Sequence, residues 1–169
     1  RDFSDKLGYR VEEISKHEVD DLAVSSTKVR NALQEGDIAQ ATNLLGHRFS
    51  LNGLVVKGDQ LGSKIGFPTA NIYIDQPHKL IPADGVYATK VVRAGATYSG
   101  MLYIGPRPTV KGHDRRIEVN IFDFDADIYG EELRLELVAH IRGDEKFVNV
   151  EAMTAQLEQD KLAALKALQ

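Results

Sequence analysis

Residues 64–74 read KIGFPTANIYI and mark the point where a glycine-rich turn gives way to an extended strand. Pro68 fixes the backbone angle there, and the β-branched residues that follow favour a strand. Thr69 and Asn71 alternate, so an extended backbone projects both side chains on one face. On residue chemistry alone, the pair fits either local turn and strand hydrogen bonding or a shared Mg²⁺, whose charge nucleotide phosphates would mostly neutralise.

Alternating apolar and polar residues on both sides of this stretch predict six short strands, separated by glycine, proline and aspartate turns. The expected strands are Phe49–Lys57, Ala70–Ile74, Gly85–Val92, Thr97–Ile104, Arg116–Phe124 and Leu133–Arg142. Six short strands predict a closed or nearly closed barrel, so the expected fold class is mainly β.

Helical patterns precede and follow the strands. Residues 25–27 supply N-cap hydroxyls for a short helix that Gly36 ends, and Asp37 and Gly46 bound a second helix. Residues 147–168 predict a final helix over one end or face of the barrel. Its expected apolar stripe consists of Val150, Met153, Leu157, Leu162, Leu165 and Leu168. The helical and strand-rich parts meet near residue 46.

Composition narrows the function classes. The chain has 169 residues, 43% of them hydrophobic, which is enough for one domain and an appendage. A net charge of −4 argues against a broad nucleic-acid surface, although it allows one local basic pocket. The absence of cysteine excludes disulfides and thiolate sites. No apolar run approaches the ~20 residues of a membrane span, and no hydrophobic signal region follows Arg1, so we expect a cytoplasmic protein and a trimmed start.

The glycines at 58, 62 and 66 are the first candidate for phosphate chemistry. Glycines before a strand can present backbone N–H groups to phosphate oxygens, and Lys64 would add a positive charge. The spacing matches neither the Walker nor the dinucleotide pattern. On glycine count alone, a flexible hairpin loop explains the segment equally well.

Glu118 is the second candidate. The strand predicted around it places Arg116, Glu118 and Asn120 on one face and aliphatic residues on the other. A strand glutamate is usually solvated, but beside a metal and phosphate it could accept a proton from an attacking alcohol. The histidines at 17, 47, 78, 113 and 140 lack ligand spacing, so we expect no zinc site.

Several motifs occur in a fixed order: GSKIGFPTANI (62–72), GVYA (85–88), IGPRPT (104–109), IEVNIFDF with IYGEEL (117–124, 128–133) and HIRGDEKF (140–147). From about residue 57 to the last helix, the chain resembles the riboflavin kinase family. The Pro-Thr-Ala-Asn tetrad at 68–71 is the most specific element, and the strand from Glu118 supports it independently. Ahead of them, VSSTKVRNALQEGD (24–37) resembles the end of the adenylyltransferase half of bacterial bifunctional riboflavin kinase/FMN adenylyltransferases, the FAD synthetases.

This resemblance implies a six-stranded antiparallel Greek-key barrel with a C-terminal helix, preceded by a short helical segment. Residues 47–169 would be the riboflavin kinase domain, and residues 1–46 a helical remnant of the nucleotidylyltransferase domain, whose N-terminal part is missing. The implied reaction transfers the γ-phosphoryl group of ATP to the ribityl 5′-hydroxyl of riboflavin, giving FMN and ADP. The implied partners are these flavins and nucleotides, with no nucleic acid and no membrane.

The resemblance also implies site residues. Glu118 would be the catalytic base, Arg142 and Phe147 would lie beside the flavin, and Thr69 and Asn71 would hold Mg²⁺. The residues implied in ATP binding are Gly58, Gly62, Lys64, Gly66, Pro68, Thr69 and Asn71. Many bacterial members carry arginine where this chain reads Gly62-Ser63-Lys64, which leaves open the side chain that contacts the phosphates.

In an intact relative, the residues matching Ser25, Ser26, Thr27 and Arg30 would help bind ATP for adenylylation. Here we expect helix capping instead, and because no histidines have His-x-x-His spacing, we expect no FAD synthesis by this chain alone. Two alternatives remain: a non-catalytic flavin or nucleotide carrier, and an oligonucleotide-binding barrel. The low aromatic content, 7%, and the negative charge disfavour the second.

Overall fold

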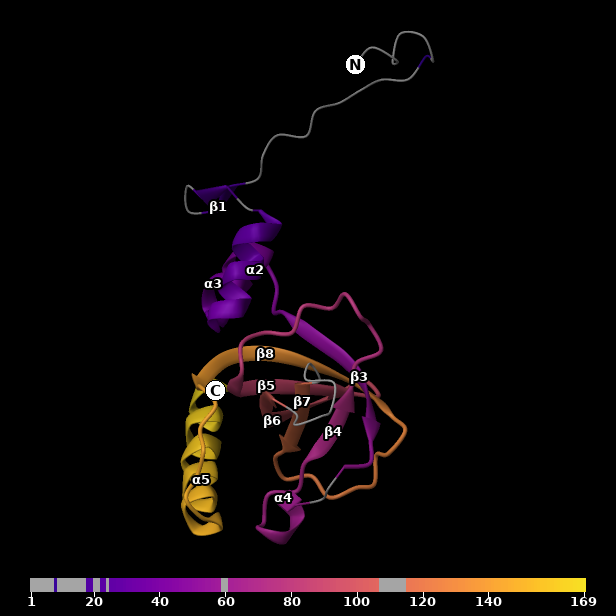
Figure 1. Ribbon diagram of the computed structural model, residues 1–169. Coiled ribbons are helices and arrows are strands. Elements are labelled where there is room, and N and C mark those ends of the chain that lie inside the picture. Colours follow the sequence, from indigo (N-terminus) through magenta and orange to yellow (C-terminus); the bar gives the residue numbers. More distant parts are fainter. Residues whose placement is uncertain (1–7, 9–17, 20–21, 24, 59–60, 107–114) are drawn as a thin grey trace.

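The computed structural model describes residues 8, 18–19, 22–23, 25–58, 61–106 and 115–169. Six strands close into a barrel in the order β3-β4-β7-β6-β5-β8, and every neighbouring pair is antiparallel (Figure 1). The strands are β3 (Ser50–Val56), β4 (Ala70–Tyr73), β5 (Gly85–Arg93), β6 (Ala96–Pro106), β7 (Arg115–Ile121) and β8 (Glu132–Arg142). The predicted six-stranded antiparallel barrel is confirmed.

The barrel closes because alternate residues of each strand turn inward and fill it. The buried side chains from the strands are Leu51, Val55, Ile72, Tyr87, Val91, Leu102, Ile104, Ile117, Val119, Ile121, Leu133, Leu135 and Leu137. Each such aliphatic side chain stabilises the fold by about 1.5–3 kcal/mol relative to an exposed position. β7 ends at Ile121 rather than at the expected Phe124, because Asp123 adopts a left-handed conformation with φ of 53° and turns the chain.

Two short helices, α2 (Ser26–Glu35) and α3 (Ile38–Leu45), lie at one end of the barrel (Figure 1). The Ser25 hydroxyl accepts from Lys28 N, and Gly36 ends α2 in the left-handed conformation, as the sequence predicted. The buried residues that join the barrel core are Ala32, Leu33, Ile38 and Ala41. Ala83 N also donates to the Leu33 carbonyl at 2.9 Å, so the helices pack on the barrel. Two short strands, β1 (Glu18–Val19) and β2 (Leu22–Ala23), pair ahead of them.

The last helix, α5 (Val150–Ala167), lies along the outside of the barrel against β5, β6 and β8 (Figure 1). Its predicted apolar stripe is partly wrong. Three of the six residues are exposed: Val150, Leu162 and Leu165. The face that contacts the barrel contains Leu157, Ala164 and Leu168, and also the carboxylate of Asp160. A single turn, α4 (Leu61–Lys64), lies at the far end, and within the described ranges no helix is long and apolar enough to cross a membrane.

Candidate functional site

The central contact of the site joins β4 to β7. The two strands pair at Ala70 with Val119 and at Asn71 with Glu118. Since directly opposed residues of an antiparallel ladder project on the same face, Asn71 and Glu118 are neighbours outside the barrel. Thr69, one step before β4, donates its hydroxyl hydrogen to Glu118 Oε2 at 3.2 Å. The structure therefore gathers the expected metal-binding pair around the expected base.

Asn120 fixes the turn that precedes Thr69. Its side chain is only 6% exposed, and Nδ2 donates to the Pro68 carbonyl at 2.6 Å. A buried amide needs such a partner, and the bond anchors the Pro-Thr-Ala-Asn segment onto β7. The sequence analysis placed Asn120 on the same face as Glu118 but gave it no role. The signal that could have indicated a role for Asn120 was its position as a polar residue on the same strand face as the expected base.

The described end of the glycine-rich segment, residues 61–67, forms a turn with its own hydrogen bonds. Gly62 accepts from Ile65 N at 3.1 Å and from Phe67 N at 2.9 Å, and Gly66 has a φ of 82° that favours glycine. A Cβ at Gly58 would collide with the Asn71 amide group. Gly58 therefore lets Asn71 pack against the backbone that follows β3. The side chain of Lys64, another expected phosphate ligand, lies outside the described atoms.

A cavity of about 290 Å³ opens beside Glu118, between the barrel, the segment after β8 and α5. The expected residues that line it are Gly62, Thr69, Glu118, Arg142 and Phe147. Its apolar lining comes from Ile65, Phe67, Val86, Met101, Met153 and Leu157. Its polar and charged lining comes from Thr69, Tyr103, Arg116, Glu118, Asn120, Arg142, Asp144 and Glu145. Apolar walls combined with polar groups suit a flat aromatic ligand that carries a polar tail.

Tyr103 and Asp144 tie the segment after β8 to the barrel. Tyr103 donates its hydroxyl hydrogen to Asp144 Oδ1 at 2.9 Å, and both residues line this cavity. Burial, together with this bond, raises the pKa of Tyr103 to about 12. The phenol thus remains protonated at neutral pH and can hold Asp144 in place.

A second cavity of about 160 Å³ lies on the other side of Thr69. It is lined by Ser63, Pro68 and Thr69 on one side and by Phe124 and Tyr129 on the other. Thr69 lines both this cavity and the one beside Glu118. Ligands in the two cavities would meet at Thr69. The sequence analysis gave no role to Phe124 or Tyr129, although they lie in the motifs IEVNIFDF (117–124) and IYGEEL (128–133).

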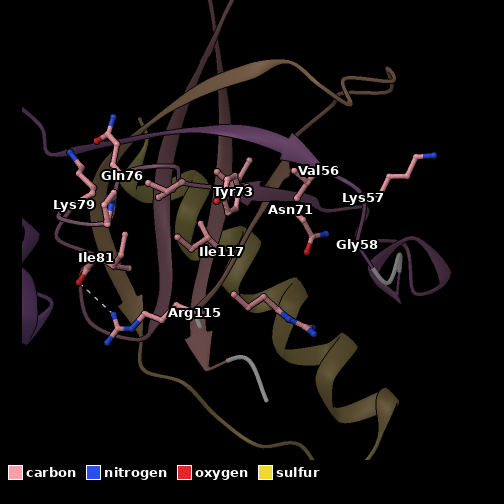
Figure 2. Close-up of a pocket in the computed structure, with 14 residues that line it drawn as sticks. Val56, Lys57, Gly58, Asn71, Tyr73, Gln76, Lys79, Ile81, Arg115 and Ile117 are labelled. Atoms are coloured by element: carbon pink, nitrogen blue, oxygen red, sulfur yellow. Dashed lines mark hydrogen bonds between the residues drawn. The ribbon is translucent and has the colours of Figure 1, made fainter. Parts of the chain in front are cut away.

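Asn71 also borders a larger cleft of about 500 Å³ (Figure 2). β4 and β7 pair at only two positions, and beyond Asn71 they separate and open the barrel wall. The cations that line the cleft are Lys57, Lys79, Arg115 and Arg116. Figure 2 shows Lys57 and Lys79 on opposite sides of the cleft, so their charges do not converge on one point. Arg115 is paired with Asp84 at 3.4 Å and Arg116 with Glu118 at 3.5 Å.

The residues around Glu118 fit a magnesium ion. Thr69 offers a hydroxyl and Asn71 an amide oxygen, which are hard oxygen ligands of the kind that Mg²⁺ prefers. Among the described residues, no three histidine, cysteine, aspartate or glutamate side chains cluster to form a site of their own. A bound Mg²⁺ would therefore take further ligands from phosphate and water.

The four residues matched to the adenylyltransferase motif lie apart from these cavities. They are Ser25, Ser26, Thr27 and Arg30, and all four are exposed at the start of α2. None of them lines any of the three cavities above. Ser25 is the N-cap of α2.

Comparisons with known proteins identify the family of the chain. The riboflavin kinase (Flavokinase) family model matches residues 45–168. The bifunctional riboflavin kinase/FMN adenylyltransferase of Bacillus subtilis is 39% identical over 86% of this chain and 47% of its own length. The enzyme of the same name from Escherichia coli K12 is 41% identical over 85% of this chain and 45% of its own. The chain thus spans about half the length of the curated relatives it matches.

Among solved structures, a macrolide-efflux protein from Streptococcus pneumoniae superposes with a TM-score of 0.87 at 35% identity, covering 96% of this chain and 53% of that one. That protein is named for macrolide efflux, and what this chain shares with it is the fold. The family match covers the whole barrel and α5, including every residue around Glu118. The chain therefore belongs to the riboflavin kinase family.

Proposed function

We propose that this chain transfers the γ-phosphoryl group of ATP to the ribityl 5′-hydroxyl of riboflavin, producing FMN and ADP. The contact between Thr69 and Glu118, at the junction of two cavities, carries the proposal. A phosphoryl acceptor in one cavity and a donor in the other would meet beside a carboxylate and an oxygen-rich metal site. Phosphoryl transfer needs chiefly this kind of positioning and charge neutralisation.

The apolar cavity beside Glu118 suits the isoalloxazine ring. Phe67 and Phe147 offer aromatic faces and Met101 and Met153 offer polarisable side chains, and Arg142 also lines the cavity. With the ring between these side chains, the ribityl tail would extend toward Glu118. We assign Arg142 and Phe147 to flavin binding on this basis.

The cavity lined by Phe124 and Tyr129 suits the nucleotide. Its aromatic side chains can contact a nucleobase, and Pro68 and Thr69 border it where the phosphates would lie. We assign the backbone around Gly58, Gly62 and Gly66, together with Lys64, to the phosphates. Magnesium, held by Thr69 and Asn71, would neutralise phosphate charge in the bound nucleotide.

Glu118 is placed to act as the general base. The proton of the 5′-hydroxyl passes to its carboxylate while the hydroxyl oxygen bonds to the γ-phosphorus. The bond from that phosphorus to the β–γ bridging oxygen breaks, and ADP leaves with the electron pair. Arg116, whose Nε lies 3.5 Å from Glu118 Oε1, helps keep the carboxylate in place before the substrates bind.

We also propose that residues 47–169 form the kinase domain and that residues 1–46 belong to a nucleotidylyltransferase unit. The family match from residue 45 and the exposed helix start at Ser25 support this division. The buried side chains of the helices in residues 26–45 nevertheless pack in the same hydrophobic core as those of the barrel strands. On this assignment the chain forms FMN but does not convert it to FAD.

A kinase assay tests the proposal. Riboflavin is incubated with Mg-ATP and the products are separated, with ADP in place of ATP as the control. We expect FMN and ADP in equal amounts, and no FAD when FMN and ATP are supplied. Binding of riboflavin without turnover would instead identify a flavin carrier and would overturn the proposal.

A further inference from the structure

Asp160 is a charged residue buried where the sequence predicted an apolar helix face. Its side chain is 1% exposed on α5, between Leu157 and Ala164 on the face that contacts the barrel. An isolated buried carboxylate costs several kcal/mol or more, so it requires a partner. Arg142 supplies it, since Nε lies 2.9 Å from Oδ1 and Nη2 lies 2.8 Å from Oδ2. Gln156 Nε2 donates to Oδ1 at 2.9 Å and completes the arrangement.

This pairing fixes the orientation of Arg142. The Arg142 side chain is 18% exposed, and the Nε and Nη2 edge of its guanidinium group is occupied by Asp160. Nη1 donates to the Gly143 carbonyl at 3.0 Å, within the segment that leaves β8. A two-point contact with a carboxylate defines a plane for the guanidinium group, which a single bond would not.

The oriented guanidinium group in turn contacts Phe147. Its central carbon lies 5.5 Å from the centre of the Phe147 ring, within the range of a cation–π contact. Arg142 and Phe147 line the cavity beside Glu118, whereas Asp160 does not. Asp160, Arg142 and Phe147 thus form a chain of contacts from the interior of α5 to the cavity wall.

We propose that Asp160 is a positioning residue for flavin binding, which it supports by holding Arg142 and, through Arg142, Phe147 in the orientation that receives the ring. The role rests on the proposed kinase function. It has an electrostatic part as well, because riboflavin is neutral and Asp160 is the buried counter-charge of Arg142. Glu145 Oε2 lies 4.0 Å from Arg142 Nη1, but its side chain is 55% exposed, so water screens that pair. The Asp160 carboxylate neutralises Arg142 without occupying the cavity.

The test is Asp160→Asn in the complete chain. Asparagine has nearly the same shape and keeps one acceptor oxygen, but it removes the charge that pairs with Arg142. We expect the KM for riboflavin to rise by about tenfold or more, in line with the loss of a charged hydrogen bond. The KM for Mg-ATP should stay within about twofold, because Asp160 contacts neither Thr69 nor the nucleotide cavity. Riboflavin affinity, measured directly by quenching of its fluorescence, should fall by the same factor as KM rises.

A matched control removes an equivalent ion pair elsewhere. Arg93 contacts Glu131 through two bonds of 2.7 and 2.8 Å, and neither residue lines the cavity beside Glu118. Glu131→Gln should leave the KM for riboflavin unchanged. Only this constant serves as the control, because Arg93 contacts Phe124, which lines the cavity assigned to the nucleotide. Gln156→Met is a milder variant, since it removes one bond to Asp160 and leaves the ion pair in place. It should raise the riboflavin KM by a smaller factor in the same direction.

The measurements are made well below the melting temperature of each variant. If Asp160 only stabilises α5, Asp160→Asn will lower the melting temperature and leave the riboflavin KM unchanged, which overturns the proposal. If Asp160→Asn does not fold, Gln156→Met becomes the test of the proposal. An unchanged riboflavin KM in Gln156→Met would then also overturn the proposal. A wild-type chain that binds riboflavin but forms no FMN would contradict the proposed kinase function, while riboflavin affinity would still test Asp160.

Discussion

Thr69 and Glu118 are 49 residues apart in the sequence, yet the hydroxyl of one donates to the carboxylate of the other at 3.2 Å. The pairing of β4 with β7 brings them together, with Asn71 directly opposite Glu118. The contact places the proposed base and the two proposed magnesium ligands at one point on the barrel surface. Glu118 and Thr69 can be tested separately. Loss of the base should lower turnover, whereas loss of the metal ligand should raise the magnesium concentration that the reaction requires.

Glu118→Gln should lower turnover by ~10²-fold or more, because the amide cannot accept the proton of the 5′-hydroxyl. The affinity for Mg-ATP should remain nearly intact, since the amide keeps the shape of the side chain. Steady-state rates of FMN formation and nucleotide binding by calorimetry measure the two effects. Glu132→Gln, at an exposed position of β8, is the control and should keep full turnover. Full turnover in Glu118→Gln would remove this residue from the mechanism.

Thr69→Ala should raise the magnesium concentration that gives half-maximal rate by about tenfold, because one oxygen ligand is lost. Titration of Mg²⁺ at fixed ATP and riboflavin measures this concentration. Thr69→Ser keeps the hydroxyl and should remain close to wild type. A magnesium dependence that is the same in Thr69→Ala and wild type would show that Thr69 is not a ligand.

Leu33→Ala should lower the free energy of unfolding of the barrel by about 2–5 kcal/mol, although the residue lies in α2. Leu33 is fully buried in the core shared with the strands, and its carbonyl accepts from Ala83. Denaturant unfolding followed by circular dichroism should show one transition at a lower midpoint. Leu162→Ala, at a side chain that is 68% exposed, should change stability by about 0.5 kcal/mol or less. Separate transitions for the helices and the barrel would contradict this prediction.

His140 should make stability depend on pH. Burial lowers its pKa from 6.5, more than the nearby backbone groups of Asp84 and Arg142 raise it. Its ring lies 4.8 Å from Tyr87 and also packs on Gly36, at the end of α2. The folded protein therefore keeps His140 neutral, whereas the unfolded chain binds a proton as the pH falls through about 6.5. Stability should be fully present above this pH and decline below it.

Thermal melting of wild type and His140→Gln between pH 7.5 and about 5 measures the effect. The melting temperature of His140→Gln should vary less with pH than that of wild type. His78→Gln, at an exposed position between β4 and β5, should retain the wild-type dependence. Equal slopes for wild type and His140→Gln would show that another group is responsible.

Sequence patterns predicted the strands and helices well, because they depend on local chemistry. The caps of α2 and α3 lie where Ser25, Gly36, Asp37 and Gly46 predicted them. β7 is shorter than predicted: apolar residues continue to Phe124, but the alternation changes phase at Ile121-Phe122, and the left-handed backbone of Asp123 ends the strand. A hydrophobic pattern does not specify the conformation of a single turn residue.

The candidate site was predicted less completely. Thr69, Asn71 and Glu118 stood out by residue type and family resemblance, and the structure places them together. Asn120 and Tyr103 were missed: Asn120 was signalled only by its position on the face of Glu118, and a tyrosine in a strand has no distinctive pattern. Their roles depend on the Pro68 carbonyl and on Asp144, which approach them only in the folded chain.

The sequence by itself determined the six alternating strands, the capped helices and the residue types at the candidate site, because side-chain periodicity and capping act over a few residues. Only the tertiary structure decided which face of α5 is buried. Leucine spacing indicated a stripe through Leu162 and Leu165, yet these side chains are exposed and Asp160 is buried. The reason is that a carboxylate can enter the interior only if a partner neutralises it, and that partner, Arg142, is supplied by the end of β8.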